Sequence, residues 1–399
     1  MNALPLGMGA GGTIHMTITN QSIPLIGVLY GGKSGEHDVS VVTAFSVMKA
    51  NDYSKYAMLP IYITYDGVFK IGQVLNSFHY AASDELRMGE TTGPRSHQFD
   101  GQIQQERLQS LSDFLLVCKN EGVSVLFPLL HGTYGEDGVI QGLFEMAHIP
   151  YVGAGVLASA CGMDKVAMKR MFAQAGLPNC TYRSFYAHQW HNEYEHWVTE
   201  IEVVLGYPCF VKPANLGSSV GIGKARNRDE LLAVVENALR FDQRIIVEEY
   251  IDGREIEVSV LGNEYPEASL PGEIVSSNDF YDYNAKYVDG KSTMHIPALI
   301  SEEQIEQIRA LAVQAYRAVD ASGLSRVDFF LVKETGDWLV NEINTMPGFT
   351  PFSMYPLMWQ ATGKPYAELL DDLIRLAIER FESRHAISYS FNKEEKAQV

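Results

Sequence analysis

Alternation of apolar and polar residues is clearest towards the C-terminal end of the chain. Two runs rich in β-branched and aromatic residues, 327–332 and 338–343, flank a turn in which Gly336 can take a positive φ. This pattern predicts an antiparallel β-hairpin. If the turn is centred near Thr335, one face carries polar side chains and the other faces the core. The predicted core positions are Val327, Phe329, Leu331 and Ile343.

The polar face of this hairpin carries a candidate metal site. The expected register places Asp328 opposite Glu342 and Arg326 opposite Asn344. Two carboxylates facing each other repel unless a cation lies between them, and the Asn344 carbonyl adds a third oxygen. Oxygen ligands of this kind suit Mg²⁺, and Arg326 would then meet phosphate. A surface hairpin with incidental acidic residues is the alternative.

Near the N-terminal end, two polar loops each follow a buried strand. The strand at 25–30 leads into Gly31 and a helix at about 39–50, and the strand at 123–130 leads into His131 and a helix at 139–147. Open α/β sheets bind ligands at the carboxyl ends of their strands, so we expect Glu36 and His131 to share one crevice. Glu36 could receive an ammonium group there. Both residues could instead have ordinary structural roles in exposed loops.

Residues 27–34 match the G-x-x-x-x-G-K-[ST] phosphate-loop pattern, but we reject that interpretation. Val28, Leu29 and Tyr30 belong to the strand itself and cannot wrap a phosphate. Glu36 and Asp38 would also repel the anion.

The middle of the chain offers candidate phosphate ligands. Asp164 can cap a helix that runs to Ala175, which places Lys165 unfavourably against the positive end of the helix dipole unless an anion lies nearby. Lys212 ends the strand at 207–213, and the small-residue loop at 214–221 follows it. Its backbone amides and the Ser218 and Ser219 hydroxyls could cover phosphates. An ordinary hairpin loop is the alternative.

Acidic and aromatic residues follow the next strand. The strand at 244–251 carries Glu248 and Glu249, and Glu255 comes just before the next strand at 256–261. Such acids can accept from an adenine amino group or from ribose hydroxyls. The polar segment 276–290 contains four aromatic residues, which favours a lid over a reaction site. Helices at 302–319 and 366–381 complete an α+β domain.

Composition narrows the possible functions. The chain has 399 residues, is 46% hydrophobic and carries a net charge of −18, which excludes nucleic acid as a bulk partner. Its 4 cysteines are widely spaced, which is typical of reduced thiols in a cytoplasm. No apolar run approaches the roughly 20 residues needed to span a bilayer.

We predict five segments along the chain. They are a loose tail at 1–22, an α/β substrate domain at 23–156, a central subdomain at 157–247, a C-terminal subdomain at 248–384 with its lid at 276–290, and a tail at 385–399. The polar stretch 65–112 is treated as an insertion in the first domain.

Several blocks of sequence, in order, resemble one family: the D-alanine–D-alanine ligases, which are ATP-grasp enzymes of bacterial cell-wall synthesis. The blocks are GGKSGEHDVS at 31–40, HGTYGEDG at 131–138, MDK at 163–165, FVKP at 210–213, GSSVG at 217–221 and NEINTMPG at 341–348. The resemblance covers about residues 25–381. It implies an ATP-grasp fold, α/β and α+β multidomain, with an N-terminal open, Rossmann-like α/β domain and two further subdomains that clasp ATP.

The resemblance also implies a role for each site residue. Glu36, His131, Arg326, Gly348 and Ser353 would bind substrate, and all but His131 would also act in catalysis together with Ser218, Lys286 and Tyr287. The residues implied in ATP binding are Lys165, Lys212, Ser218, Ser219, Glu248, Glu249, Ile251, Glu255, Phe280, Lys286, Phe330, Asn341 and Glu342. Asp328, Glu342 and Asn344 would hold Mg²⁺ or Mn²⁺, with two ions expected.

The implied reaction joins two D-alanines through a D-alanyl phosphate. Related ligases that make the D-alanine–D-lactate ester carry Phe at the position of Tyr287 or lack the lid motif, and the motif at 281–287 is intact here, so we predict the dipeptide product. The alternatives are a D-alanine–D-lactate ligase, another ATP-grasp carboxylate–amine ligase, or an ATP sensor without catalysis. The family also implies a cytoplasmic homodimer with small-molecule substrates only.

Overall fold

The first sheet forms an open α/β unit at the N-terminal end of the chain. In this computed structural model, which describes residues 23–90, 111–217, 220–275 and 293–387, the strand order is β3-β2-β1-β4, with β1, β2 and β4 parallel and β3 antiparallel to β2. The strands are β1 (Leu25–Gly31), β2 (Ala57–Ile63), β3 (Phe69–Ile71) and β4 (Val123–Pro128), and the helices are α1 (His37–Ala50), η1 (Ser83–Arg87), α2 (Leu111–Glu121) and α3 (Val139–Ala147). The parallel core matches the predicted Rossmann-like domain.

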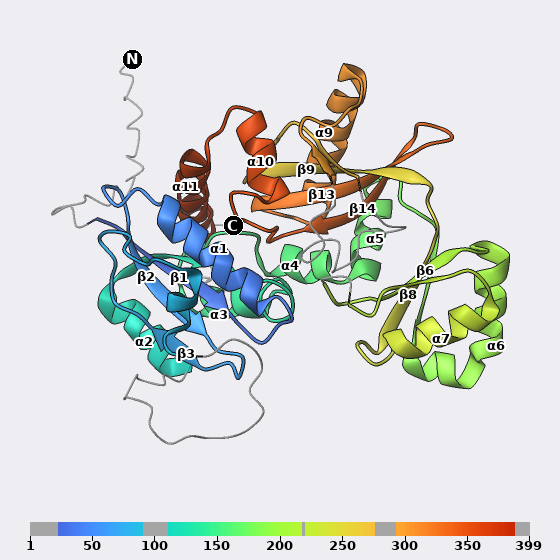
Figure 1. Ribbon diagram of the computed structural model, residues 1–399, viewed down its shortest axis with the longest axis horizontal. Helices are drawn as coiled ribbons and strands as arrows, with labels where there is room; N and C mark the ends of the chain where they lie inside the picture. The colour runs from blue at the N-terminus through green and yellow to red at the C-terminus, as the bar shows by residue number, and fades with distance from the viewer. Residues whose placement is uncertain (1–22, 91–110, 218–219, 276–292, 388–399) are drawn as a thin grey trace, which may run out of the picture.

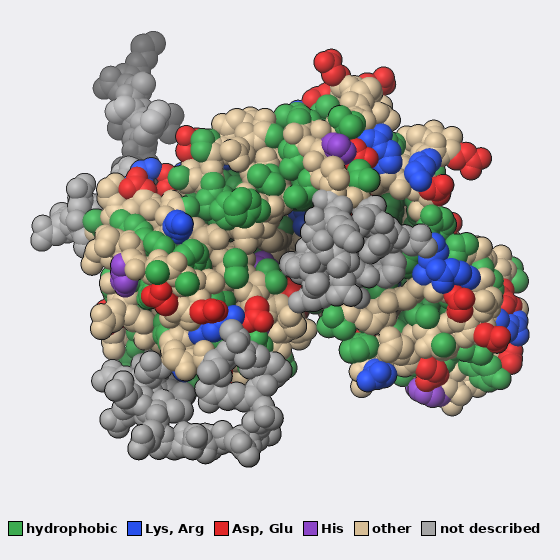
Figure 2. Space-filling view, viewed as in Figure 1, with side chains coloured by type: hydrophobic (Ala, Val, Ile, Leu, Met, Phe, Trp, Pro, Cys, Tyr) green, Lys and Arg blue, Asp and Glu red, His purple; other side chains and the backbone are tan. Residues whose placement is uncertain are grey.

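The second sheet is antiparallel, in the order β5-β8-β6-β7. It contains β5 (Tyr182–Tyr186), β6 (Cys209–Pro213), β7 (Gly223–Ala225) and β8 (Arg244–Glu249), with helices α6 (Ala187–Val204) and α7 (Arg228–Ala238). Phe185, Trp190 and Val247 are part of its apolar core. Figure 1 shows both helices beyond the strands, away from the other two sheets. On the face drawn in Figure 2, acidic and basic side chains are intermixed over this unit.

The third sheet has six strands and carries the predicted hairpin. Its order is β12-β11-β9-β13-β14, with β10 paired to β9. The strands are β9 (Gly253–Gly262), β10 (Glu267–Ala268), β11 (Gly272–Val275), β12 (Thr293–His295), β13 (Gly323–Val332) and β14 (Trp338–Asn344), and the later helices are α9 (Glu302–Ala318), α10 (Met354–Ala361) and α11 (Tyr366–His385). Two helices from earlier in the chain, α4 (Val156–Met163) and α5 (Lys165–Gln174), complete its surroundings.

Apolar packing ties the first and third units together. Phe127 of β4 shares a buried cluster with Trp359 of α10 and Leu373 of α11. Met168 and Phe172 of α5 lie in the core beneath the third sheet, so this helix, which falls in the predicted central subdomain, packs against the C-terminal one. The division of the chain into domains stays a prediction.

The register expected for the hairpin is confirmed. Asp328 pairs with Glu342 and Arg326 pairs with Asn344, and Gly336 takes a φ of +74° in the turn. The sequence pattern did not predict a β-bulge, in which the register shifts after Asp328 so that Phe329 faces Val340. Two consecutive residues of β14 therefore lie opposite one residue of β13.

Other local predictions also held. Residues 27–30 lie within the buried strand β1, which supports rejecting the phosphate-loop interpretation. The Asp164 side chain accepts from the Val166 and Ala167 amides at the start of α5. The sequence analysis did not predict helices α2, α4, α6, α7 and α10. Among the residues that the structure describes, no helix is both long enough and apolar enough to cross a membrane.

Candidate active site

Two adjoining cavities lie where the three sheets meet. The first, of about 660 Å³, is lined by Glu36 and His131 from the first unit and by Ser353 from the third. The second, of about 410 Å³, is lined by Lys212 and Glu248 from the second unit and by strands of the third. Residues that line both cavities mark their junction: Lys165, Ile222, Glu257, Ile274, Arg326 and Glu342. A molecule in one cavity could therefore react with a molecule in the other at this junction.

Three carboxylates cross the third sheet at the junction. Glu257 of β9 pairs in register with Asp328 of β13, which pairs with Glu342 of β14. Arg326 lies among them because residues two apart on a strand point to the same face. Its Nε is 2.7 Å from Asp328 Oδ1 and 3.1 Å from Glu257 Oε2. Three negative charges with one guanidinium leave the group anionic, which favours a cation there.

Two lysines enclose a buried glutamate in the second cavity. Glu248 is 3% exposed, with Oε2 2.6 Å from Lys212 Nζ and Oε1 3.0 Å from Lys169 Nζ. Burial alone would raise the pKa of Glu248, but the two lysine charges outweigh it and lower that pKa to about 2. Burial likewise opposes the charge of Lys212, yet Glu248 raises its pKa overall. The three groups together retain one positive charge.

Lys165 lies at the first position of α5, where its backbone amide donates to Ala214 O at 2.9 Å. Its Nζ donates to Leu216 O at 2.7 Å, which directs the amine towards the loop that follows β6. Burial lowers the pKa of Lys165, and neighbouring Lys212 adds to this effect against the opposing charge of Glu342. A bound anion would relieve this repulsion between the two lysines.

Glu36 and His131 both line the first cavity, as expected from their places at the ends of β1 and β4. His131 is 4% exposed, and its Nδ1 lies 3.2 Å from Met346 O and 3.3 Å from Glu136 Oε1. Both neighbours accept, so Nδ1 carries a hydrogen. Nε2 is buried with no hydrogen-bond partner among the described residues, and buried polar atoms are rarely left so. A ligand in the cavity can supply that partner.

Family models decide the identity of the chain. The model described as D-ala D-ala ligase N-terminus matches residues 25–154, and the one described as D-ala D-ala ligase C-terminus matches residues 171–375. The chain belongs to the D-alanine–D-alanine ligase family. The resemblance inferred from the sequence blocks is therefore confirmed.

Comparisons with individual proteins support the same family assignment. A D-alanine–D-alanine ligase from Bacillus cytotoxicus is 50% identical over 369 residues, which covers 92% of this chain and 98% of that protein. One from Listeria innocua is 46% identical and covers 91% of this chain and 97% of its own length. Among solved structures, the D-alanine–D-alanine ligase from Coxiella burnetii matches with a TM-score of 0.71 and 32% identity over 91% of this chain and 96% of that one. The VanG D-Ala:D-Ser ligase from Enterococcus faecalis matches with 0.72 and 34%, over 89% of this chain and all of the other.

The remaining described site residues predicted from the ligase family also reach the cavities. Ser353 caps α10 beside Gly348, where an added Cβ would lie 3.2 Å from Ser353 Oγ. The second cavity is lined by Glu249, Ile251, Glu255, Phe330 and Asn341. Two of the predicted positions, Ser218 and Ser219, lie outside the described residues. The predicted lid at 276–290, with Phe280, Lys286 and Tyr287, also lies outside them. The catalytic and binding roles assigned to all these ligase residues stay predictions.

The donor atoms at the junction fit the divalent ion expected for this ligase family. Asp328, Glu342 and Asn344 lie side by side. The two acids offer carboxylate oxygens, and Asn344 offers an amide oxygen. Within the described ranges, no three His, Cys, Asp or Glu side chains are grouped closely enough to hold a metal by themselves. Mg²⁺ commonly takes one or two carboxylates and completes its shell with water and substrate phosphates. A site with two carboxylates near Lys165 and Lys212 fits this mode of Mg²⁺ binding.

Sequence reasoning missed three site residues of this ligase. Glu136 accepts from His131, Glu257 contacts Arg326, and Lys169 holds Glu248. Lys169 was detectable because it lies four residues after Lys165, on the same face of α5. Glu136 lies within the quoted block at 131–138 but was not singled out. Glu257 carried no local signal, since only the pairing of β9 with β13 brings it to Arg326.

Proposed function

We propose that the protein joins two D-alanines to D-alanyl-D-alanine, with ATP cleaved to ADP and phosphate, for peptidoglycan precursor synthesis. The junction of the two cavities at Arg326 supports this most directly. A carboxylate bound near Glu36 and a phosphate bound near Lys212 would meet there. Family membership supports the choice of substrate.

The first step activates a carboxylate. Glu36 would accept hydrogen bonds from the ammonium group of the first D-alanine, and His131 Nε2 would contact the same molecule. A carboxylate oxygen then attacks the γ-phosphorus of ATP, the bond from that phosphorus to the β-phosphate oxygen breaks, and ADP leaves. The products are D-alanyl phosphate and ADP. Lys165 and Lys212 would hold the phosphates during this transfer.

The second step forms the peptide bond. The neutral amine of the second D-alanine, whose carboxylate Ser353 would receive, attacks the carbonyl carbon of D-alanyl phosphate. The carbon–oxygen bond to phosphate breaks, phosphate leaves and the nitrogen releases a proton. Arg326 and the Gly348 amide would stabilise the negative charge that develops on the oxygens.

Asp328, Glu342 and Asn344 are the residues that would hold Mg²⁺. When bound, the ion neutralises charge on the phosphates and orients them for displacement. Arg326 donates to both oxygens of Asp328, so the carboxylate that would hold the ion also holds the guanidinium. The expected homodimer and the cytoplasmic location stay predictions.

ADP release in the presence of D-alanine, L-alanine, D-serine or D-lactate tests this function. We expect rapid ADP release and a dipeptide product with D-alanine alone. No turnover with D-alanine would contradict the proposal. D-serine is included because VanG is named a D-Ala:D-Ser ligase, and a mixed product formed faster than D-alanyl-D-alanine would change the assigned second substrate.

A further inference from the structure

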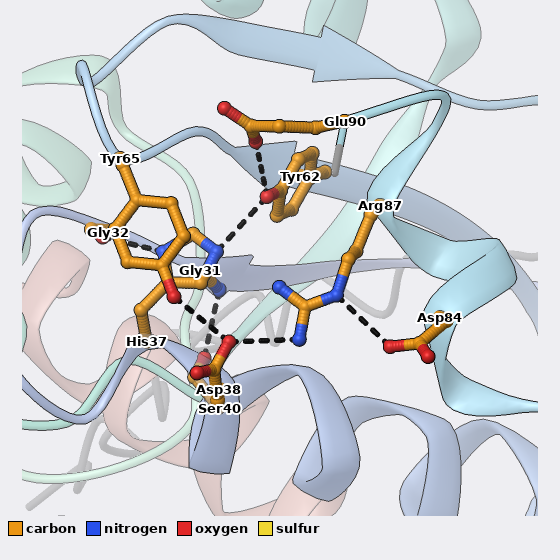
Figure 3. A network of polar contacts seen from close by, with 10 residues as sticks. All are labelled: Gly31, Gly32, His37, Asp38, Ser40, Tyr62, Tyr65, Asp84, Arg87 and Glu90. Atoms are coloured by element: carbon orange, nitrogen blue, oxygen red, sulfur yellow. Dashed lines mark hydrogen bonds and ion pairs between the residues drawn. The ribbon is translucent and has the colours of Figure 1, made fainter. Parts of the chain in front are cut away.

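A buried network of polar groups surrounds His37, next to Glu36 in the chain. His37 is 1% exposed, and its Nδ1 lies 2.7 Å from Gly32 O. On the other side of the ring, Nε2 lies 2.9 Å from the Tyr62 hydroxyl, which also contacts Glu90 Oε2 (Figure 3). Of these three residues, His37, Tyr62 and Glu90, only His37 is adjacent in sequence to a residue used in the proposed reaction.

The contact with Gly32 closes the loop that carries Glu36. Gly32 is the first residue after β1, and His37 is the first residue of α1, so this hydrogen bond joins the two ends of the loop. Glu36 lies between them. Gly31 and Gly32 have φ values of +91° and +93°, conformations that most other residues avoid. Glycine allows this loop conformation but does not fix it, so other contacts must hold the loop in place.

Further contacts fix the same loop to the sheet. The Gly31 amide donates to Ser40 Oγ at 2.8 Å, and Ser40 in turn donates to Leu129 O at the end of β4. The Gly32 amide donates to Ile63 O at 2.7 Å. With both amides satisfied in this way, the His37 ring holds the Gly32 carbonyl, and the loop bearing Glu36 is tied to the strand that leads to His131.

The His37 ring is held from several sides. Tyr65 stacks on it, with ring centroids 3.6 Å apart and an interplanar angle of 16°. The Tyr65 hydroxyl donates to Asp38 Oδ1 at 2.8 Å, and Arg87 donates to the same oxygen at 2.7 Å. Figure 3 shows Arg87 reaching Asp38 from the segment that also carries Glu90. The imidazole has little freedom to turn away from Gly32.

The Tyr62 hydroxyl links His37 to Glu90. A carbonyl can only accept, so Nδ1 of His37 carries a hydrogen and donates to Gly32 O. The Tyr62 hydroxyl has one hydrogen, which it donates to Glu90 Oε2, and its oxygen lies 2.9 Å from His37 Nε2. Glu90 therefore fixes the Tyr62 hydroxyl, and that hydroxyl holds the Nε2 side of the ring. Tyr62 and Glu90 together keep Nδ1 of His37 facing Gly32.

We propose that His37 is a positioning residue for the subsite that Glu36 forms, and that Tyr62 and Glu90 orient its imidazole. This inference rests on the proposed function, because it assigns the loop to the binding of the first D-alanine. His37 touches no substrate. It acts by holding the loop in which Glu36 meets the ammonium group.

An assay limited to the first D-alanine tests the proposal. Saturating hydroxylamine attacks the carbonyl carbon of D-alanyl phosphate, releases phosphate and yields a hydroxamate, so the rate depends on one D-alanine and ATP. His37→Gln places an amide near Tyr62 but not near Gly32, whereas His37→Asn keeps an amide donor near the Nδ1 position. Tyr62→Phe removes the hydroxyl that contacts His37. Tyr65→Phe is the matched control, since it keeps the stacking and removes a hydroxyl that contacts Asp38.

We expect His37→Gln to raise the KM for D-alanine about tenfold, as for the loss of one buried hydrogen bond, and Tyr62→Phe to raise it about threefold. His37→Asn should stay within about threefold of the wild type. The KM for ATP and the melting temperature should match those of Tyr65→Phe. Unchanged D-alanine KM values in His37→Gln and Tyr62→Phe would overturn the role of His37, as would KM values for D-alanine and ATP that rise together with a lower melting temperature. A wild type that makes no hydroxamate would instead overturn the proposed function.

Discussion

Arg326 and Asp328 lie two residues apart on one strand and form a bidentate ion pair. Arg326 Nε and Nη2 each donate to a different oxygen of Asp328 at 2.7 Å. Asn344 also donates to Asp328, at 3.1 Å. The pair holds the guanidinium at the junction of the two cavities, and only a planar, forked donor can make both bonds.

Replacing Arg326 with lysine should therefore impair catalysis more than folding. We expect kcat to fall by about 100-fold or more, because an ammonium cannot keep the forked pair with Asp328 and also reach the charge that is proposed to develop in the transition state. ADP release measures kcat, and Arg309→Lys on α9 is the matched control, since Arg309 binds Ala268 O far from the cavities. Equal kcat values in the two variants would contradict this role.

Glu342→Gln should increase the Mg²⁺ requirement. Removing one of the two expected carboxylate ligands should raise the Mg²⁺ concentration for half-maximal activity at least tenfold. Glu334→Gln, in the exposed turn of the same hairpin, serves as the control. Calorimetry of ATP binding at several Mg²⁺ concentrations provides a second measurement. An unchanged Mg²⁺ dependence would remove Glu342 from the metal site.

Glu248→Gln should destabilise the protein in a pH-dependent way. Loss of the charge leaves Lys169 and Lys212 buried without their carboxylate, which should cost about 3 kcal/mol in the free energy of unfolding. The pKa of Glu248 is lowered to about 2 in the folded protein and is about 4.3 in the unfolded chain. The charge of Glu248 therefore contributes fully to the free energy of unfolding above about pH 4.3, and this contribution is lost as the pH falls towards 2.

Urea denaturation of the wild type and Glu248→Gln at several pH values measures this contribution. The difference between the two proteins should be constant from about pH 5 to 8 and should shrink below about pH 4. Glu267→Gln, on the exposed edge strand β10, should show no such difference. A constant difference down to pH 2 would contradict the charge-based explanation.

Glu136→Gln should lower the pKa of His131. Burial opposes protonation of His131, but the hydrogen bond and charge of Glu136 outweigh it, and the net effect raises the pKa. A neutral amide at position 136 removes that stabilisation of the imidazolium. NMR titration of the His131 ring protons measures the change, with Asp137→Asn as the control. A pKa that stays the same or rises would show that Glu136 does not set it.

The sequence predicted the hairpin well because its signals are local. A turn glycine and a two-residue period fix which residues of two adjacent strands face each other. The loops that bear Glu36 and His131 were also predictable, since the carboxyl ends of neighbouring parallel strands share one edge of a sheet. The order and identity of the blocks then indicated the family.

Contacts between distant elements could not be predicted in the same way. Lys169 meets Glu248 because α5 packs beside β8, and Glu257 meets Arg326 because β9 pairs with β13. The sequence contains both residues but not the packing that unites them. The hydrogen bonds of Tyr62 and Arg87 around His37 depend on tertiary packing in the same way.

The bulge in β14 makes Asn341 an extra residue in the hairpin. If Asn341 were absent, Val340 would still face the core, and Glu342 would follow it on the opposite side, beside Asp328. The ladder of backbone hydrogen bonds would then be regular. The side chain of this extra residue lines the second cavity, where ATP is proposed to bind. We therefore infer that the bulge in β14 brings the Asn341 side chain to the cavity where ATP is proposed to bind.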